Sequence, residues 1–169
     1  SNNDLVINDR SKSLIKLNDK RKEIENSILE EIDFKKIEKE NKDVIIYYNP
    51  NINEGLIGII AARLKDYFNK PCIVITVSNE LLKGSARSIY NYNIGRVIKN
   101  SLDQGIILNG GGHNMAAGFT LNKANLKDFE IYILEDFLKS NTVNDNLFLY
   151  ESEVSPLAFN QDFYDDIKK

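Results

Sequence analysis

Residues 54–77, "EGLIGIIAARLKDYFNKPCIVITV", determine the predicted fold class. Residues 54–68 are apolar around most of a helical circumference, which predicts a buried helix capped at its start by Asn53. Pro71 ends the helical pattern, and the following "CIVITV" predicts a strand that is apolar on both faces. A buried helix that leads into a buried strand is typical of an α/β domain.

The sequence on either side of this stretch extends the unit. Further strands are predicted at 43–49, 81–90 and 116–121. Further helices are predicted from Asn93 to about Ser101 and over 126–138, the second opened by Asn122 or Asn125. The fold class is therefore α/β, with a central mixed sheet of about four to five strands flanked by helices.

The N-terminal part predicts a connector. Residues 10–32 form one long, mostly polar helix, and its narrow apolar stripe suggests that it lies along another surface. The stripe consists of Leu14, Leu17, Ile24 and Ile28. Residues 33–42 follow as a charged link without a clear pattern. We therefore divide the chain into a connector at 1–42, a compact domain at 43–140, and a linker with the start of a truncated C-terminal domain at 141–169.

Charge and composition exclude several classes of protein. Residues 43–123 carry eight basic and five acidic side chains, so only this part has an electrostatic bias toward an anionic partner. No apolar run approaches the ~20 residues of a membrane-spanning helix, and no signal peptide is visible, so we expect a cytoplasmic protein that does not enter a membrane. The single cysteine, Cys72, excludes a disulfide and is expected to be a buried thiol.

Metal ligands of the usual kinds are scarce in this sequence. One histidine and one cysteine cannot build a common zinc site, and the carboxylates of the middle region are scattered over separate elements. We therefore expect no metal in this chain. If it takes part in phosphoryl chemistry, the metal and the attacking water must come from another domain.

The segment "KGSARS", residues 83–88, is the first candidate site. Arg87 can contact a phosphate with two parallel hydrogen bonds, and the hydroxyls of Ser85 and Ser88 can donate to the remaining oxygens. Gly84 would let a ligand approach the backbone closely. The alternative is an ordinary strand with polar residues on its exposed face.

The segment "GGGHNMAAG", residues 110–118, is the second candidate site. Consecutive glycines, including Gly111 and Gly112, permit a backbone nest whose N–H groups converge on an anion. His113 follows directly and can donate to a phosphate or transfer a proton near neutral pH, with Asn114 beside it. The alternative is a tight glycine turn into a core strand. Dinucleotide and P-loop fingerprints do not fit the spacing.

Together, "EGLIGIIAARL", "KPCIVITV", "KGSARS" and "GGGHNMAAGF" resemble, in this order and spacing, the associated C-terminal domain of Asp-His-His phosphoesterases. Within that superfamily they are similar to the RecJ family of single-stranded-DNA-specific exonucleases. The charged N-terminal helix looks like the family's connector between catalytic core and associated domain. The tail from residue 147 looks like the start of its oligonucleotide-binding barrel. The resemblance covers most of the chain.

This resemblance implies a substrate-binding domain of a 5′→3′ exonuclease that acts in DNA repair and recombination. The family's catalytic domain, which holds manganese or magnesium, would precede this chain, and the barrel would follow it. The chain alone is then expected to be inactive, with 5′-phosphorylated single-stranded DNA as its partner. Carried over by motif, the phosphate-binding residues are Gly84, Ser85, Arg87, Ser88, Gly111, Gly112 and the adjoining Asn114, with His113 in an accessory role toward phosphate or a proton.

One position departs from the family pattern. A Trp-His pair usually precedes the first glycine of the "GLIGI" helix, and here Ile52 and Asn53 occupy those places. The resemblance also leaves two other interpretations open. One is the associated domain of an oligoribonuclease or cyclic-dinucleotide phosphodiesterase of the same superfamily. The other is a non-catalytic RNA-binding or editing module, like the related domain of alanyl-tRNA synthetases.

Overall fold

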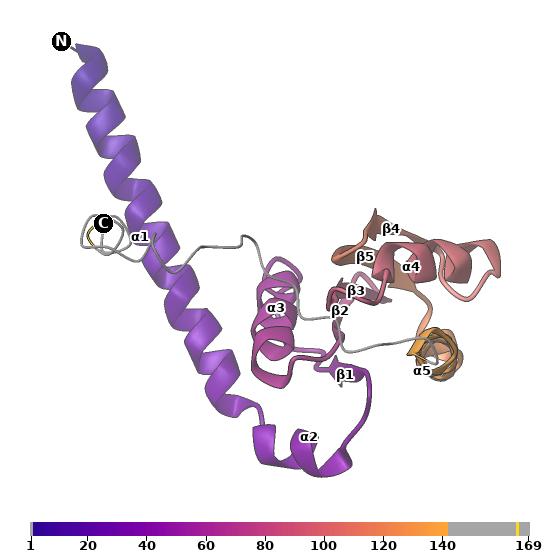
Figure 1. The fold of residues 1–169 in the computed structure, drawn as a ribbon. Coiled ribbons are helices and arrows are strands. Elements are labelled where there is room, and N and C mark those ends of the chain that lie inside the picture. The colour runs from indigo at the N-terminus through magenta and orange to yellow at the C-terminus, as the bar shows by residue number, and fades with distance from the viewer. Residues whose placement is uncertain (1, 142–164, 166–169) are drawn as a thin grey trace.

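The computed structural model describes residues 2–141 and residue 165, so the expected C-terminal piece lies almost entirely outside the described residues. Five strands and five α-helices follow one another within the described residues 2–141 (Figure 1). They are α1 (Asn2–Glu31), α2 (Phe34–Glu40), β1 (Ile45–Tyr48), α3 (Ile57–Phe68), β2 (Cys72–Ser78), β3 (Leu81–Arg87), α4 (Ile94–Asp103), β4 (Asn109–His113), β5 (Ala116–Leu121) and α5 (Leu126–Asn141), with a 3₁₀ turn at Lys123–Asn125 before α5.

The strands form one mixed sheet in the order β1-β2-β3-β5-β4. β1 and β2 are parallel and are joined through α3, whereas all other neighbours are antiparallel. The β2–β3 hairpin turns at Asn79 and Glu80, which both have positive φ angles. The predicted α/β class, with a mixed sheet flanked by helices and a long N-terminal helix, is confirmed.

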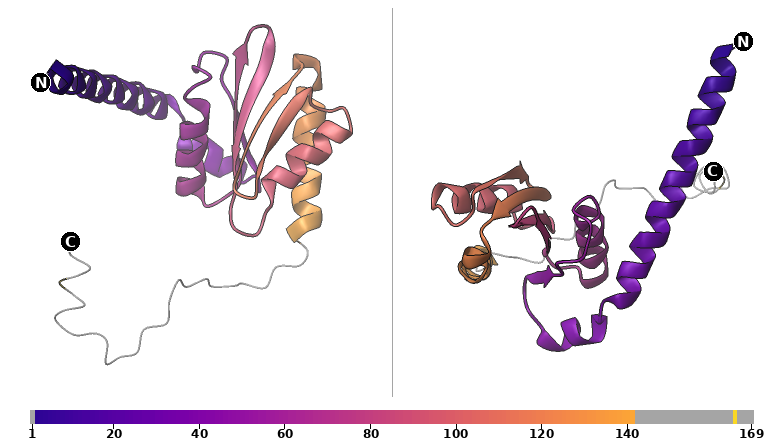
Figure 2. Two further views of the ribbon diagram at one scale, coloured as in Figure 1. Left: turned by 90° about the horizontal axis from the view of Figure 1, so that it is seen from above. Right: turned by 180° about the vertical axis from the view of Figure 1, so that it is seen from behind.

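One face of the sheet, which we call the covered face, packs against α4 and α5 (Figure 2, left). Asn93 caps α4 as predicted, because its side chain accepts a hydrogen bond from the backbone N–H of Arg96 (3.0 Å). The buried side chains from the strands on this face are Ile73, Ile75, Leu82, Ala86, Ala117, Phe119 and Leu121. They meet the apolar sides of both helices, including Phe129, Ile133 and Phe137 of α5.

The opposite face, which we call the open face, is covered by α3 over β2 and β3. Ile57, Ile60 and Leu64 of α3 pack on Cys72 and Val74 of β2, the two residues of "CIVITV" that point away from the covered face. This alternation explains why the strand is apolar on both faces. None of the described helices lies above the open face over β5 and β4 (Figure 2, left).

Helix α1 projects away from the sheet, and only its last turns reach α3 (Figures 1 and 2). The predicted stripe is therefore packed only at its end: Leu14 and Leu17 are exposed, whereas Ile28 packs beside α3. The buried carboxylate of Glu25 accepts hydrogen bonds from Arg21 of the same helix (3.1 Å) and from Arg63 of α3 (2.7 Å). The ion pair between Arg63 and Glu25 joins α1 to the domain.

Two local expectations were wrong. The supposed link at 33–42 contains the short helix α2, because Asp33 caps it through the backbone N–H of Lys36 and Phe34 packs on the rings of Tyr67 and Phe68. Asn53 does not cap α3, which begins at Ile57. The Asn53 side chain instead accepts from the N–H of Gly55 (2.8 Å), which forms a turn before the helix.

Candidate phosphate-binding site

The residues of "KGSARS" alternate between the two faces of β3. Lys83, Ser85 and Arg87 lie on the open face, because successive side chains of a strand point in opposite directions. Gly84 and Ala86 lie on the covered face and are buried. The strand therefore presents two cations and one hydroxyl in a row along the open face.

Arg87 is held in a defined position on this face. Its Nη1 donates to Ser85 Oγ (3.1 Å) and to the carbonyl of Ala86 (2.9 Å). A Cβ at position 58 of α3 would lie 3.0 Å from Arg87 Nη2 and 3.2 Å from Ser85 Oγ. Gly58 therefore makes the space that the guanidinium and the hydroxyl occupy between α3 and the sheet.

Arg87 also differs from three other arginines of the chain, because each of those contacts a carboxylate. Arg21 and Arg63 both contact Glu25, and Arg96 pairs with Asp136 (2.8 Å). Arg87 forms no ion pair with a carboxylate within the described residues. A half-buried, positioned guanidinium without a counter-ion is suited to bind an anion that the chain itself does not supply.

The strand register brings the two predicted motifs onto the same face. Ser85 lies opposite Gly118 of β5, and Gly118 lies opposite Gly111 of β4. In the adjacent row Arg87 lies opposite Ala116, which lies opposite His113. β3 and β4 are each neighbours of β5, so the two motifs are about 10 Å apart across one strand.

The glycine run is a strand and not the anion nest that its composition predicts. Gly110, Gly111 and Gly112 belong to β4, and none of them has a positive φ angle. The tight turn follows at Asn114 and Met115, between the paired residues His113 and Ala116. A nest needs successive N–H groups that converge on one point, and an extended strand directs them alternately to opposite sides.

The three glycines of β4 differ in how much space a side chain would have at each position. A Cβ at Gly110 would crowd Ile107 and Ile98 on the covered face, at 2.8 and 2.9 Å. A Cβ at Gly112 would overlap the backbone of Ala117. A Cβ at Gly111, by contrast, would meet nothing within 4 Å. Packing therefore explains the outer two glycines but leaves Gly111 unexplained.

Two predicted phosphate ligands make structural contacts within the domain. Ser88 is 1% exposed, and its hydroxyl donates to the carbonyl of Tyr92 (2.5 Å), so it stabilises the loop before α4. At Gly84 the ring of Phe119 occupies the space where a Cβ would be on the covered face, whereas the residue also lines the groove on the open face. The glycine is needed for this ring contact between neighbouring strands.

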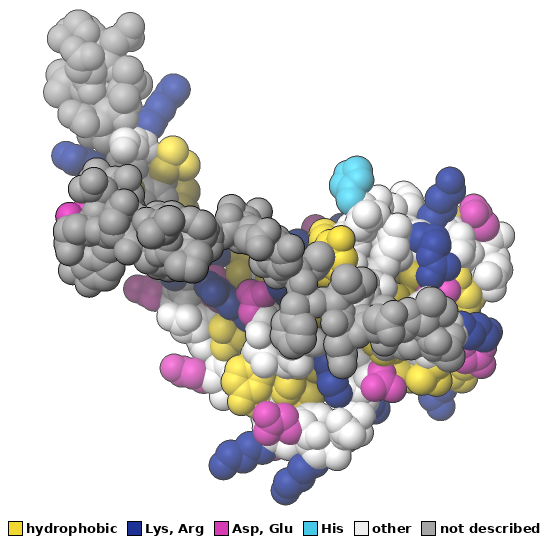
Figure 3. All heavy atoms as spheres, in the orientation of Figure 1, with side chains coloured by type: hydrophobic (Ala, Val, Ile, Leu, Met, Phe, Trp, Pro, Cys, Tyr) yellow, Lys and Arg dark blue, Asp and Glu magenta, His cyan; other side chains and the backbone are white. Residues whose placement is uncertain are grey.

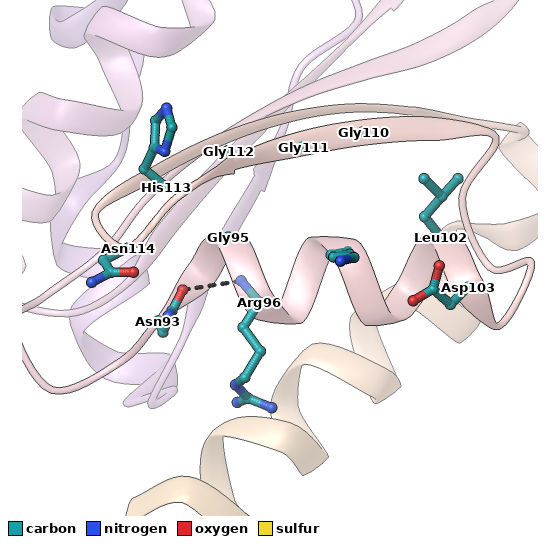
Figure 4. Close-up of a pocket in the computed structure, with 11 residues that line it drawn as sticks. Asn93, Gly95, Arg96, Leu102, Asp103, Gly110, Gly111, Gly112, His113 and Asn114 are labelled. Atoms are coloured by element: carbon teal, nitrogen blue, oxygen red, sulfur yellow. Dashed lines mark hydrogen bonds between the residues drawn. The ribbon is translucent and has the colours of Figure 1, made fainter.

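His113 and Asn114 are both exposed at the end of β4. Figure 4 shows His113 on the side of β4 away from α4, whereas Arg96 of α4 projects toward α5. The single histidine is the cyan side chain at the upper rim in Figure 3. The carbonyl of Asn114 accepts from the N–H of Ile94 (3.2 Å), which ties the turn to α4.

Two grooves run beside β4, one on each side. The groove on the open face is lined by Ile57, Lys83, Asn109, Gly111, Gly118 and Thr120. The other groove lies between α4 and β4, and its charged residues are Arg96, Lys99 and Asp103 (Figure 4). Ser85 and Arg87 line neither groove. The row of Ser85 leads into the first groove through Gly118 and Gly111. The second groove is lined by four residues of the predicted site, Gly111, Gly112, His113 and Asn114.

Five of the residues named above for the groove on the open face were not among the predicted site residues: Ile57, Lys83, Asn109, Gly118 and Thr120. The two-residue alternation of β3 could have placed Lys83 beside Ser85 and Arg87. Gly118 and Thr120 carry no such signal, because their position depends on the strand register.

The charge around the site is modest. In the view of Figure 3, acidic and basic side chains are interspersed and do not form one continuous patch. Lys83 pairs with Glu54, which precedes α3, through Nζ and Oε2 at 2.8 Å. Hydrogen bonds from Lys83 and, to a smaller extent, Ser78 lower the pKa of the Glu54 carboxyl. Binding of an anion must therefore depend on local contacts.

Residues that departed from the family pattern are also accounted for. Ile52 is 4% exposed and packs in the core beneath α3, and its carbonyl accepts from Thr76 Oγ1 (2.6 Å).

Within the described part of the chain, no three His, Cys, Asp or Glu side chains are grouped so that they could hold a metal ion. No helix found there is both long and apolar enough to cross a membrane.

Comparison with known proteins agrees with the motifs. Residues 41–140 match the DHHA1 domain family. The single-stranded-DNA-specific exonuclease RecJ of Haemophilus influenzae is 36% identical over 140 residues, which are 75% of this chain and 24% of that protein. The Bacillus subtilis protein of the same name is 32% identical over 142 residues, which cover 82% of this chain and 17% of the relative. The chain thus spans about a quarter or less of these curated relatives.

A solved structure shows the same fold. RecJ from Thermus thermophilus, in complex with Mg²⁺, superposes with a TM-score of 0.61 at 22% identity, over 75% of this chain and 19% of that one. The resemblance to the Asp-His-His superfamily inferred from the motifs is confirmed. Because the family match covers more than half of its residues, the chain belongs to the DHHA1 domain family.

Proposed function

We propose that this chain is the substrate-binding domain of a metal-dependent 5′→3′ exonuclease for single-stranded DNA that acts in DNA repair and recombination. In this proposal the open face binds the 5′-terminal phosphate of the strand. Arg87 supplies the charge, Ser85 donates a hydroxyl hydrogen bond, and His113 contacts the strand from the neighbouring row. The likeness to RecJ proteins supports the choice of substrate, since those relatives are named for single-stranded DNA.

The observation that carries the proposal is the positioned guanidinium of Arg87. It is fixed by Ser85 and by the space at Gly58, and no carboxylate among the described residues neutralises it. An arginine that served only as a solvated surface charge would not need these fixed contacts. Ordering of the side chain before binding lowers the entropic cost of holding a phosphate.

The described residues do not fit the divalent metals that the superfamily implies. Because no three potential ligands come together among them, we derive no hydrolytic step from this chain. The chemistry of a bound metal pair, activation of water for attack on a phosphodiester, would have to come from a preceding catalytic domain. Residues of this chain bind and orient the phosphate, and His113 offers a hydrogen bond beside it.

Binding of oligothymidylates with and without a 5′-phosphate to this chain tests the proposal. We expect weak binding that favours the phosphorylated strand and falls as salt rises, because phosphate contacts release counter-ions. Arg87→Ala should reduce affinity for the phosphorylated strand about tenfold, in line with the loss of one charge-assisted contact. The same preparation should not degrade the strand when Mn²⁺ is added.

Arg10→Ala provides the matched control, since it removes the same charge from the exposed part of α1. Its affinity should equal that of the unmodified chain. An Arg87→Ala variant that folds and binds the phosphorylated strand as well as the control would exclude Arg87 from the site. Tighter binding of a cyclic dinucleotide than of the phosphorylated strand would instead identify a small-substrate relative.

A further inference from the structure

The groove on the open face lies beside the residues assigned to the 5′-phosphate, and it is lined by Lys83, Asn109 and Thr120. Lys83 precedes Ser85 by two residues on β3, so their Cα atoms are about 7 Å apart on the same face. In the row of Lys83, the register places Thr120 of β5 and then Asn109 of β4. This row therefore offers an ammonium group, a hydroxyl and an amide across three strands.

Among the described residues, little protein lies directly above the two glycines in this part of the sheet. Gly111 and Gly118 lie between the row of Lys83 and the row of Arg87. A Cβ at Gly118 would touch nothing closer than 3.9 Å, and one at Gly111 would touch nothing within 4 Å. Ile57 of α3 lines the same groove and gives it one apolar side. An extended polymer can therefore lie along the groove against the bare backbone.

Lys83 is not free in the unbound chain. Its ammonium group contacts Glu54 at 2.8 Å, and both side chains are nearly half exposed, at 41% and 47%. Exposed ion pairs of this kind are weak, because both groups remain well solvated when they separate. A phosphate that enters the groove therefore competes with Glu54 for Lys83 at little cost.

We propose that Lys83, Thr120 and Asn109 form a second phosphate subsite, which holds the next phosphate of a single strand whose 5′-end lies at Ser85 and Arg87. Glu54 occupies the ammonium group of Lys83 until the strand displaces it. The inference rests on the proposed function and adds to it a subsite that depends on strand length. A 5′-mononucleotide, with one phosphate, reaches only the first subsite, whereas a trinucleotide reaches both.

The experiment compares 5′-phosphorylated thymidine mononucleotide and trinucleotide as ligands of this chain. Lys83→Met should weaken trinucleotide binding about threefold to tenfold and leave the mononucleotide unchanged. Glu54→Gln should strengthen trinucleotide binding about twofold to fivefold, because the competing carboxylate is removed. The salt dependence of trinucleotide binding should lose about 0.7 in slope in Lys83→Met, the value for one single-strand phosphate contact.

Lys99→Met is the matched control, since Lys99 is an exposed lysine beside the other groove. It should leave both affinities unchanged. Equal affinity of Lys83→Met and the unmodified chain for the trinucleotide overturns the subsite. Equal losses for both ligands also overturn it, because Lys83 would then act only through general charge. Arg87→Ala separates the two proposals. If Arg87→Ala weakens binding and Lys83→Met does not, only the second subsite fails. If neither Arg87→Ala nor Lys83→Met weakens binding, the proposed function itself fails.

Discussion

The two faces of the sheet differ in what lies above the same three strands. Over the covered face, α4 and α5 pack so closely on β3, β5 and β4 that the ring of Phe119 fills the place of a side chain at Gly84. On the open face, α3 covers β3, where Gly58 lies beside Ser85. Among the described residues, no helix lies above Gly118 of β5 and Gly111 of β4. Adjacent residues of one glycine run therefore serve opposite requirements, close packing on one side and access on the other.

The largest effect on the free energy of unfolding is expected when a methyl group is added to the glycine run of β4 on the covered face. Gly112→Ala would place its Cβ against the backbone of Ala117, and should lower the free energy of unfolding by about 1–3 kcal/mol, as overpacked sites do. Gly111→Ala should change it by less than about 1 kcal/mol, because the added Cβ is unobstructed. Urea unfolding of both variants measures the difference. Equal losses would show that the two faces do not differ at β4.

The second prediction tests whether α3 shields the open face of β2 from solvent. Cys72 shares a cross-sheet row with Arg87 but is fully buried, and burial raises the pKa of its thiol from near 9 to about 12. The protonated thiol therefore contributes stability that is complete below about pH 9 and is lost as the pH rises toward 12. The decline attributable to this thiol should approach about 1.4 kcal/mol per pH unit.

Unfolding free energies of the unmodified chain and of Cys72→Ala across this pH range measure that decline. The variant should be less stable at neutral pH because of the cavity, but its curve should fall less steeply. Parallel curves for the two proteins would mean that solvent reaches Cys72, and hence that α3 does not close this part of the face.

The smallest effect concerns the two arginines on opposite sides of the sheet. Arg96→Ala removes the partner of Asp136, which is 16% exposed, and should lower the free energy of unfolding by up to about 1 kcal/mol. Its affinity for a phosphorylated oligonucleotide should not change. Arg87→Ala should show the reverse pattern. Thermal unfolding and binding, measured on both variants, would contradict the assignment if Arg96→Ala weakened binding as much as Arg87→Ala.

Periodicity in the sequence was sufficient for the main elements. The apolar run after Pro71 located β2, the strand-like segments 81–90 and 116–121 contained β3 and β5, and the Asn93 cap located α4, because these signals come from neighbours along the chain. The motif "KGSARS" also contained the arginine of the candidate site. The short helix α2 escaped notice, since its only local signal is the Asp33 cap and ring contacts of Phe34 with α3 also stabilise it.

The site itself could be predicted only in part. Glycine composition suggested a nest, but the run is extended because β5 pairs with it along its whole length. Ser88 was expected on the phosphate and is instead bonded to Tyr92, a partner only four residues away that no motif signals. The contact of Gly58 with Arg87 and the alignment of Gly111 with Ser85 both depend on tertiary packing and strand register.

The ion pairs of Glu25 have a mechanical consequence. They lie near the end of α1, and about 23 residues of helix extend beyond them, which corresponds to about 35 Å at 1.5 Å per residue. A rotation of only about 5° at this anchor moves the far end of the helix by about 3 Å, comparable to the length of one hydrogen bond. The Glu25 ion pair with Arg63, together with the packing of Ile28 beside α3, therefore limits how accurately α1 can place anything that it carries relative to the open face.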